Sequence, residues 1–246
     1  MMNLRMVAPK RLVDINRVPG LARIAIDDDR LTIGALARHT DVQASPVVRQ
    51  YAPLLIAAYQ HVAHRAIRNR GTIGGNVAHA DPASELPAVM LALDAEMVLN
   101  SRTGERRVSA ERFFLGTFET AARADELLTA IHISLAAGSR RWGFEEISQR
   151  QGDFALVAVA ATFTVEGGRC AGTRLAYAGV ADHAVRIAAA EAALDDGSPH
   201  EALFEAVAAK AAETVDPPED IHADGAYRRD LVRALTRRAL GGAARR

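Results

Sequence analysis

The order of strand-like and helical segments in the second half of the chain restricts its fold more than any other feature. Runs with apolar alternation and β-branched residues come first, at 142–148, 155–165 and 174–180. Helical stretches follow, at 183–194, 199–214 and 226–240. Period-two alternation favours an antiparallel sheet. Because the strands precede the helices instead of alternating with them, the pattern predicts an α+β fold.

The first half of the chain mixes short strands and helices. Strands are expected at 23–26 and 30–33 around an acidic turn, and again at 96–100, 106–109 and 126–134. Helices are expected from Pro53 to about His64 and from Ser84 to Leu93. Residues 71–82 hold three glycines, an Asn, an Asp and a Pro, which predicts an irregular loop. A change of composition near residues 136–139 divides the chain into predicted domains 1–136 and 137–246.

Charge and composition exclude several classes of protein. Lys and Arg total 30 and Asp and Glu total 30, so there is no net basic charge to attract nucleic acid. Cys170 is the single cysteine, which excludes an internal disulfide and a cysteine-ligated iron–sulfur cluster. The longest apolar-rich stretch, 155–165, is about half of the roughly 20 residues that cross a membrane. With no signal peptide in the N-terminal sequence, a cytoplasmic location is expected.

The sharpest local motif is RNRGTIGGN, residues 68–76. Its glycines can adopt positive φ, and consecutive amides in such a turn can converge on an anion. Thr72 and Asn76 add side-chain donors suited to a phosphate or pyrophosphate. The glycines alone favour a structural turn. The motif is neither a phosphate-binding loop ending in Gly-Lys-Ser/Thr nor the GxGxxG dinucleotide fingerprint.

The longer string IRNRGTIGGNVAHADPASELPAVMLALDA, residues 67–95, resembles the second flavin-binding loop of the FAD-binding subunits of molybdenum hydroxylases, the carbon monoxide dehydrogenase and xanthine dehydrogenase family. Further stretches match in the same order: RLVDINRVPGL, LTIGALARHTDV, DELLTAIHI, SQRQGDFALVAVAATF and LAYAGV. The resemblance implies an FAD-binding domain of the vanillyl-alcohol-oxidase type. A small C-terminal domain of a three-stranded antiparallel sheet plus helices would follow it.

The resemblance also implies cofactor contacts. It assigns the pyrophosphate to Gly71, Thr72, Ile73, Gly74, Gly75 and Asn76, and polar or packing contacts with the cofactor to Asp81, Glu85 and Leu128. Asp153 and Tyr177 would lie near the isoalloxazine ring; the alternatives are a turn residue and a core aromatic. No residue of this chain is expected to act as nucleophile, general acid or metal ligand.

Other candidate residues have ordinary explanations. His61 and His64 share a helix face but lack the HExxH zinc pattern, so a satisfied or solvent-facing pair is expected. His79 either touches the cofactor or caps a turn. Cys170 is a poor nucleophile without a defined histidine partner.

The implied function is electron transfer. Such a chain takes electrons from the [2Fe–2S] clusters of a small partner subunit and passes them through FAD to NAD⁺, quinone or oxygen. A large molybdopterin-binding subunit oxidises the substrate and selects it. The alternatives are a flavin-less scaffold or interaction subunit, a non-functional truncated fragment and, less favoured, a free-standing flavin oxidase.

The N-terminal sequence departs from the family pattern. MMNLRMVAP matches the segment that directly follows the family's first flavin loop, an Ala-Gly-Gly-x-Ser-like turn. That loop does not occur upstream of Arg11. Since each charge-assisted hydrogen bond to a pyrophosphate contributes roughly 1.5–3 kcal/mol, the chain as written is expected to bind FAD weakly or not at all.

Overall fold

The computed structural model describes residues 2, 5, 7–136 and 140–246. Its first layer is an antiparallel sheet in the order β1-β2-β7-β3-β4. The strands are β1 (Ile24–Asp27), β2 (Arg30–Gly34), β3 (Glu96–Ser101), β4 (Gly104–Ser109) and β7 (Leu127–Ser134). A two-stranded ribbon, β5 (Phe114–Gly116) and β6 (Glu119–Thr120), lies beside it.

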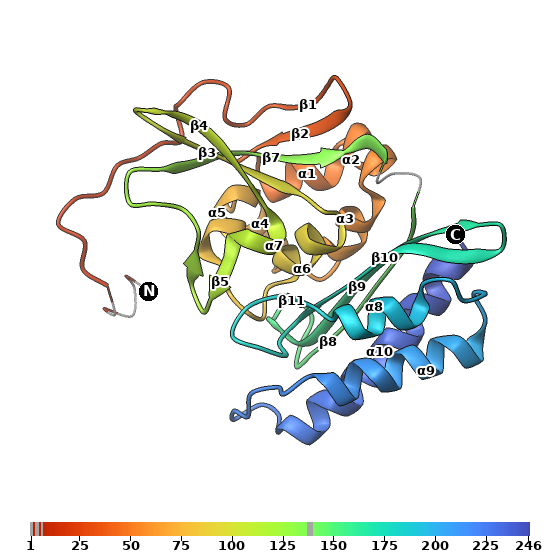
Figure 1. Cartoon of the computed structure of the whole chain (residues 1–246). Helices are drawn as coiled ribbons and strands as arrows, with labels where there is room; N and C mark the ends of the chain where they lie inside the picture. The colour runs from red at the N-terminus through yellow and green to blue at the C-terminus, as the bar shows by residue number, and fades with distance from the viewer. Residues whose placement is uncertain (1, 3–4, 6, 137–139) are drawn as a thin grey trace.

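Short helices connect and cover these strands (Figure 1). They are α1 (His39–Ala44), α2 (Pro46–Tyr51), α3 (Pro53–Ala58), α4 (Arg65–Arg68), α5 (Ile73–His79), α6 (Glu85–Ala92) and α7 (Ala110–Phe113). The long helix predicted from Pro53 is shorter than expected, because α3 ends at Ala58 and turns follow. Helix α6 is buried along its whole length, so it forms the centre of the first core.

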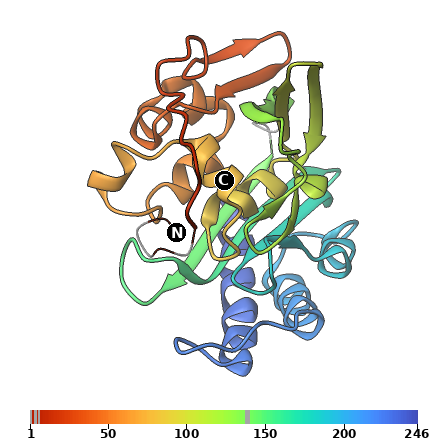
Figure 2. The ribbon, with the colours of Figure 1, turned by 90° about the vertical axis from the view of Figure 1, so that its left-hand side faces the viewer.

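A second antiparallel sheet follows in the order β11-β10-β9-β8. Its strands are β8 (Arg141–Ser148), β9 (Ala155–Glu166), β10 (Arg169–Ala178) and β11 (Val185–Arg186). The three predicted strands are confirmed, and the two-residue β11 is an addition that the sequence pattern did not reveal. Helices α8 (Ala188–Leu194), α9 (Glu201–Thr214) and α10 (Gly225–Ala244) pack together on one face (Figures 1 and 2).

The two faces of this second sheet have different partners. Alternate residues of β9 and β10 pack against α8–α10 in one core, whereas their neighbours join the core of the first layer. Ion pairs reinforce the junction, since Asp94 lies 2.7 Å from Arg174 and 3.0 Å from Arg140. The predicted α+β architecture is confirmed. The boundary predicted between residues 136 and 137 adjoins residues 137–139, which lie outside the described residues, so it stays a prediction.

Candidate functional site

The glycine-rich segment contains a helix, which corrects the prediction of an irregular loop. Helix α5 begins after Thr72, whose Oγ1 accepts a hydrogen bond from Gly75 N at 3.1 Å. It ends at His79, and the residue that follows, Ala80, has a φ of 51°. The sequence misled because glycine disfavours helices on average, and here a cap and tertiary packing offset that preference.

Close packing of neighbouring residues explains two of the three glycines. The N–H groups of Ile73 and Gly74 donate to Ala37 O and Ala35 O at 3.0 and 2.9 Å. A Cβ on Gly74 would lie 2.4 Å from the Cβ of Ala35, and one on Gly71 would lie 2.8 Å from His39 Cδ2. Glycine at 71 and 74 is therefore required for close packing of α5.

The same pairing removes the predicted nest of free amides. The N–H groups of Ile73, Gly74 and Gly75 have acceptors, and Asn76 N donates to Thr72 O at 3.1 Å. An anion at this helix would therefore meet mainly side-chain donors. Ile73 and Gly74 are buried beneath the surface, while Gly75 is exposed.

A groove of about 500 Å³ runs over this turn. Its lining comprises Ile15, Asn16, Leu36, Arg38, His39, Arg70, Gly71, Thr72, Gly75, Asn76 and His79. Arg38 donates to Asn16 Oδ1 at 2.7 Å and to the carbonyl of Arg70, so its guanidinium is fixed at the groove wall. The groove thus presents guanidinium, hydroxyl and amide donors, which are suited to a phosphate-containing ligand.

A smaller inner cavity of about 200 Å³ adjoins the groove. It is lined by His39, Val62, Ala63, Ile67, Asn76, Glu85, Gly152, Asp153 and Phe154. His39 and Asn76 line both spaces. Asn76 is held in place because its Oδ1 accepts a hydrogen bond from Ser84 Oγ at 3.0 Å. A long ligand that passes these two side chains can therefore reach from the groove into the cavity.

Glu85 is the most buried acidic group on the wall of the inner cavity, at 3% exposure. Burial raises the pKa of its carboxyl to about 7, and the charge of Asp81 acts in the same direction. Asp81 itself accepts a hydrogen bond from Ala83 N at 2.9 Å. The loop before Glu85 is also tied to the second sheet, since Gly179 N donates to Pro82 O at 2.8 Å. The second sheet therefore helps to position Glu85.

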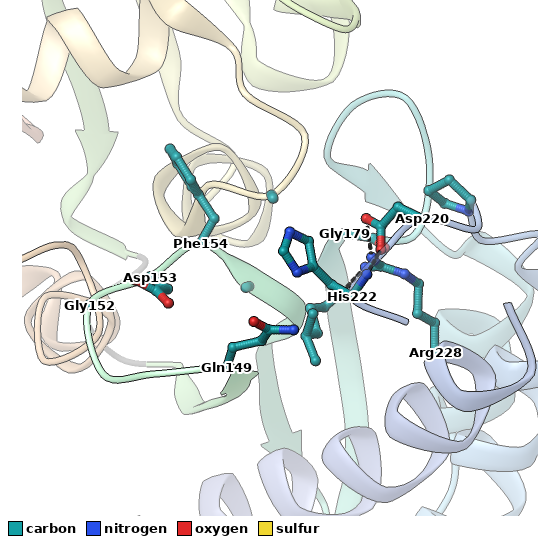
Figure 3. Close-up of a pocket in the computed structure, with 12 residues that line it drawn as sticks. Gln149, Gly152, Asp153, Phe154, Gly179, Asp220, His222 and Arg228 are labelled. Atoms are coloured by element: carbon teal, nitrogen blue, oxygen red, sulfur yellow. Dashed lines mark hydrogen bonds and ion pairs between the residues drawn. The ribbon is translucent and has the colours of Figure 1, made fainter. Parts of the chain in front are cut away.

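An outer pocket of about 460 Å³ lies on the other side of the turn 149–154 (Figure 3). Gln149, Asp153 and Phe154 form one side, and Asp220 and His222 approach from the segment before α10. Gly152, Asp153 and Phe154 line both this pocket and the inner cavity. The turn thus forms the partition between the two spaces.

Buried Arg228 supports the far side of the outer pocket. It pairs with Asp220 at 2.7 Å and donates to the carbonyl oxygens of Leu156 and Gly179. Asp220 in turn accepts hydrogen bonds from the backbone N–H groups of His222 and Ala223 at 2.8 and 3.0 Å. This network fixes the segment that carries His222 against the ends of β9 and β10.

Comparison with known proteins decides the family. Residues 1–135 match the family model described as the FAD binding domain in molybdopterin dehydrogenase. Residues 142–243 match the model of the CO dehydrogenase flavoprotein C-terminal domain. The chain belongs to the FAD-binding medium subunits of the molybdenum hydroxylases. FAD is the cofactor of this family.

Relatives that match along nearly the whole chain support the same family. The 6-hydroxypseudooxynicotine dehydrogenase complex subunit alpha of Paenarthrobacter nicotinovorans is 38% identical, and the match covers 100% of this chain and 83% of the relative. The carbon monoxide dehydrogenase medium chain of Hydrogenophaga pseudoflava is 33% identical over 99% of this chain and 85% of its own length. These identities place the subunit among dehydrogenase complexes.

Solved structures show the same fold. Carbon monoxide dehydrogenase from Hydrogenophaga pseudoflava that lacks the Mo-pyranopterin moiety superposes with a TM-score of 0.96 at 36% identity, covering 100% of this chain and 85% of that chain. Quinoline 2-oxidoreductase from Pseudomonas putida 86 gives 0.93 at 36% identity, over 99% and 85% of the two chains. No helix among the described residues of the subunit is both long and apolar enough to cross a membrane.

Besides Ile73 and Gly74, three of the residues singled out from the sequence of this medium subunit line none of the groove, the inner cavity and the outer pocket: Asp81, Leu128 and Tyr177. Tyr177 is fully buried in the core beneath α8–α10, and its hydroxyl lies 3.0 Å from Thr236 Oγ1. This core position agrees with the core-aromatic alternative, and a place near the ring stays a prediction. Leu128 on β7 lies in the first core and does not line the three spaces.

His39 is a residue of the medium subunit's candidate site that the sequence did not single out. It is 5% exposed, and its Nδ1 lies 3.2 Å from the hydroxyl of Tyr59. Burial lowers the pKa of His39 to about 4, so the ring is neutral at physiological pH. In the sequence, His39 is only a polar residue that follows the apolar alternation LTIGALAR. That is a weak signal of a site residue, because its partner Tyr59 is distant in the sequence.

Proposed function

We propose that FAD lies along the groove with its pyrophosphate over Thr72 and its isoalloxazine ring toward the inner cavity. The observation that supports this most is the shared lining by His39 and Asn76, because it makes one elongated site from two spaces. The two ends of this elongated site differ in chemistry, as the charged pyrophosphate and the largely apolar ring of FAD require. Arg38 and Arg70 provide positive charge at the groove, whereas Val62 and Ile67 provide apolar surface at the cavity.

The residues present fit the cofactor. Gly71, Thr72, Gly75 and Asn76 reach the groove surface, and Ile73 and Gly74 contribute by fixing the backbone beneath it. Glu85 and Asp153 reach the inner cavity, while Asp81 orders the loop before Glu85. Bound FAD supplies redox chemistry; this chain's residues supply orientation and electrostatics.

We further propose that the subunit relays electrons within a larger complex. A single buried cysteine rules out an iron–sulfur cluster held by this chain's cysteines, so reducing equivalents come from the [2Fe–2S] clusters of a small partner. A molybdopterin-binding large subunit completes the complex and selects the substrate. A cytoplasmic location of the complex is part of this proposal.

The outer pocket is the proposed approach of the external electron acceptor. It is separated from the inner cavity only by the turn that carries Asp153 and Phe154. Phe154 is 56% exposed, although it lines both spaces, so its ring is available to an incoming molecule. NAD⁺, a quinone and oxygen are the acceptor classes to compare.

Flavin titration tests the cofactor site. Asn76→Ala removes a side chain that lines both spaces and is expected to weaken FAD binding by roughly 5- to 30-fold, the loss of one or two hydrogen bonds. Asn100→Ala, on β3 away from the site, is the matched control and leaves the affinity unchanged. FAD fluorescence quenching measures both in the complex reconstituted with its partner subunits, because the chain as written is expected to bind FAD weakly or not at all. Equal affinities for Asn76→Ala and the control contradict the proposed placement.

Rapid kinetics of the reconstituted complex tests the acceptor route. Phe154→Ala is expected to alter the rate at which an external acceptor reoxidises the flavin and to leave its reduction through the partner subunits unchanged. Tyr227→Ala, an exposed aromatic on α10 that lines none of the three spaces, is the control. If Phe154→Ala leaves reoxidation unchanged with every acceptor class, the outer pocket is not the route.

A further inference from the structure

One arginine of the RNRGTIGGN motif has a role that the groove does not explain. Arg70 lines the groove, whereas Arg68 lines none of the three spaces. Arg68 is the last residue of α4, and its Nη1 donates to the carbonyl oxygens of Val62 and Ala63 at 2.8 and 2.6 Å. Both acceptors belong to the loop 59–64 between α3 and α4. The side chain of Arg68 therefore binds this loop.

The loop 59–64 forms one wall of the inner cavity, because Val62 and Ala63 line it. Ala63 has a φ of 45°, which is a left-handed conformation that an alanine adopts only when its surroundings hold it. The two carbonyl groups that Arg68 binds stand on either side of the Ala63 Cα. Arg68 therefore fixes both peptide groups that define the left-handed bend of the wall.

The guanidinium of Arg68 is committed to these two carbonyl groups. Among the described residues, no Asp or Glu lies within 4.0 Å of it, and its Nε is buried without a hydrogen-bond partner. Hydrogen bonds from a charged donor are stronger than neutral ones, so the bonds to the loop hold it firmly. Burial lowers the pKa of His39, and the charge of Arg68 acts in the same direction. This agrees with a cation close to the residues that line the cavity.

The loop also touches the turn that separates the inner cavity from the outer pocket. Gly152 has a φ of 86°, and a Cβ there would lie 2.7 Å from His64 Cε1 and 3.2 Å from the carbonyl carbon of Ala63. The backbone of Gly152 therefore lies directly against residues 63 and 64. Asp153 and Phe154 follow in the same turn and line both spaces. A displacement of the loop therefore moves this turn or opens a gap beside it.

We propose that Arg68 is a positioning residue for the inner cavity. It fixes the loop 59–64 around Ala63 and, through the contact at Gly152, the turn 152–154, so that the flavin ring is enclosed by two walls that support each other. The proposal rests on the assignment of this cavity to the flavin ring. Arg68 lines neither the cavity nor the outer pocket and acts through the backbone of the loop.

Hydrogen exchange of the full chain without flavin tests the support of the walls. Arg68→Met removes both hydrogen bonds and keeps a long side chain. It is expected to speed exchange of the amides in 59–64 and 152–154 by about tenfold or more, because the lost bonds come from a charged donor. Arg68→Lys keeps a charged donor and should give an intermediate rate.

Arg65→Met is the matched control, since Arg65 is exposed on the same helix. It should leave exchange in both segments unchanged. Wild-type exchange in the two segments of Arg68→Met overturns the proposal. Equal acceleration along the whole chain overturns it as well, because it would show a general effect on stability.

His64→Ala tests the contact between the loop and the turn. Its side chain is exposed, so the fold should be retained, and the variant removes the ring that packs against Gly152. Exchange is expected to rise in 152–154 and to stay slow in 59–64, where Arg68 still binds the carbonyl groups. Unchanged exchange in 152–154 overturns the proposed link between the two walls.

Acrylamide quenching of flavin fluorescence in the reconstituted complex tests the enclosure of the ring. Arg68→Met is expected to raise the quenching constant several-fold, because a displaced wall admits the quencher and water. Arg68→Lys should lie between this variant and the wild type, and Arg65→Met should match the wild type. Equal quenching constants for Arg68→Met and Arg65→Met overturn the positioning role.

The experiments separate this proposal from the one on which it rests. If Arg68→Met loosens both segments but the complex binds no FAD, the flavin assignment fails and the support of the two walls by Arg68 stands. If FAD binds and its quenching does not depend on Arg68, the flavin assignment stands and the positioning role fails.

Discussion

The two faces of the second sheet are built from the same strands but differ in composition. Toward α8–α10, β9 and β10 present large apolar side chains such as Val159, Phe163 and Leu175. Toward the first layer they present alanines, among them Ala158 and Ala176. The helix-facing side therefore has the larger apolar area for stability, whereas the alanine side permits close approach of α6.

Polar groups differ between the faces as well. On the helix-facing side, the hydroxyl groups of Tyr177 and Thr236 form a hydrogen bond with each other. On the alanine side, Thr162 donates to Ala92 O at 2.9 Å, but the carboxylate of Glu146 has no hydrogen-bond partner. A buried carboxyl that lacks a hydrogen bond lowers stability.

The largest effect is expected from the helix-facing side. Phe163→Ala removes a fully buried ring and should lower the free energy of unfolding by about 3–5 kcal/mol. Ala160→Gly on the opposite face is the comparison and should cost only about 1 kcal/mol. Urea denaturation measures both. Equal losses would show that the two faces contribute alike.

The next effect concerns Glu146 and depends on pH. Its pKa of about 8 in the folded state exceeds that of an unfolded glutamate, so the folded state binds more protons between about pH 4.5 and 8. Stability therefore falls as pH rises through that window, by on the order of 3 kcal/mol between pH 5.5 and 7.5. Glu146→Gln should flatten this decline, leaving the smaller contribution of Glu85. Urea unfolding at pH 5.5, 6.5 and 7.5 gives the slopes, and an unchanged slope in the variant contradicts the expectation.

A smaller effect is expected from Tyr177→Phe. The variant leaves the hydroxyl of Thr236 without its partner and should cost about 1–2 kcal/mol. Because Tyr177 lies on the helix-facing side, FAD affinity should not change. Thermal unfolding and flavin titration measure the two outcomes. A loss of flavin affinity at unchanged stability would return Tyr177 to the site.

The smallest effect is expected from Glu145→Gln. Glu145 pairs with Arg238 at the surface of the helix-facing side, and both side chains are partly exposed. Such pairs contribute about 0–1 kcal/mol, and salt weakens them. Denaturation at low and high salt should show a small difference that disappears at high salt. A salt-independent loss above 2 kcal/mol would show that the pair is more than a surface contact.

Much of the fold could be predicted from the sequence. Strands β8, β9 and β10 and helices α9 and α10 follow apolar periodicity, which reflects one buried face and needs no knowledge of the partner. Helix α5 was missed because its stability depends on Ala35 and Ala37, which pair with it from a distant segment. Strand β11 was missed because two residues are too short to show a pattern.

The candidate site, too, could be predicted from the sequence only in part. The motif around Thr72 and Asn76 was visible in the sequence because its residue types have a recognisable order. His39 was not visible, since its role arises from Tyr59 and from the packing of Gly71. Asp153 was identified by its motif, but its position between two cavities needed coordinates.

By itself, the sequence determined the α+β order of elements, the family and the absence of a cysteine-ligated cluster. Only the tertiary structure decided which face each residue occupies relative to its partners. Glu145 and Glu146 are identical neighbours in the sequence, yet Glu145 pairs with Arg238, whereas Glu146 is buried without a hydrogen-bond partner. The reason is physical. A strand directs successive side chains to opposite faces of the sheet, and the residues that each face contacts come from segments far away in the chain.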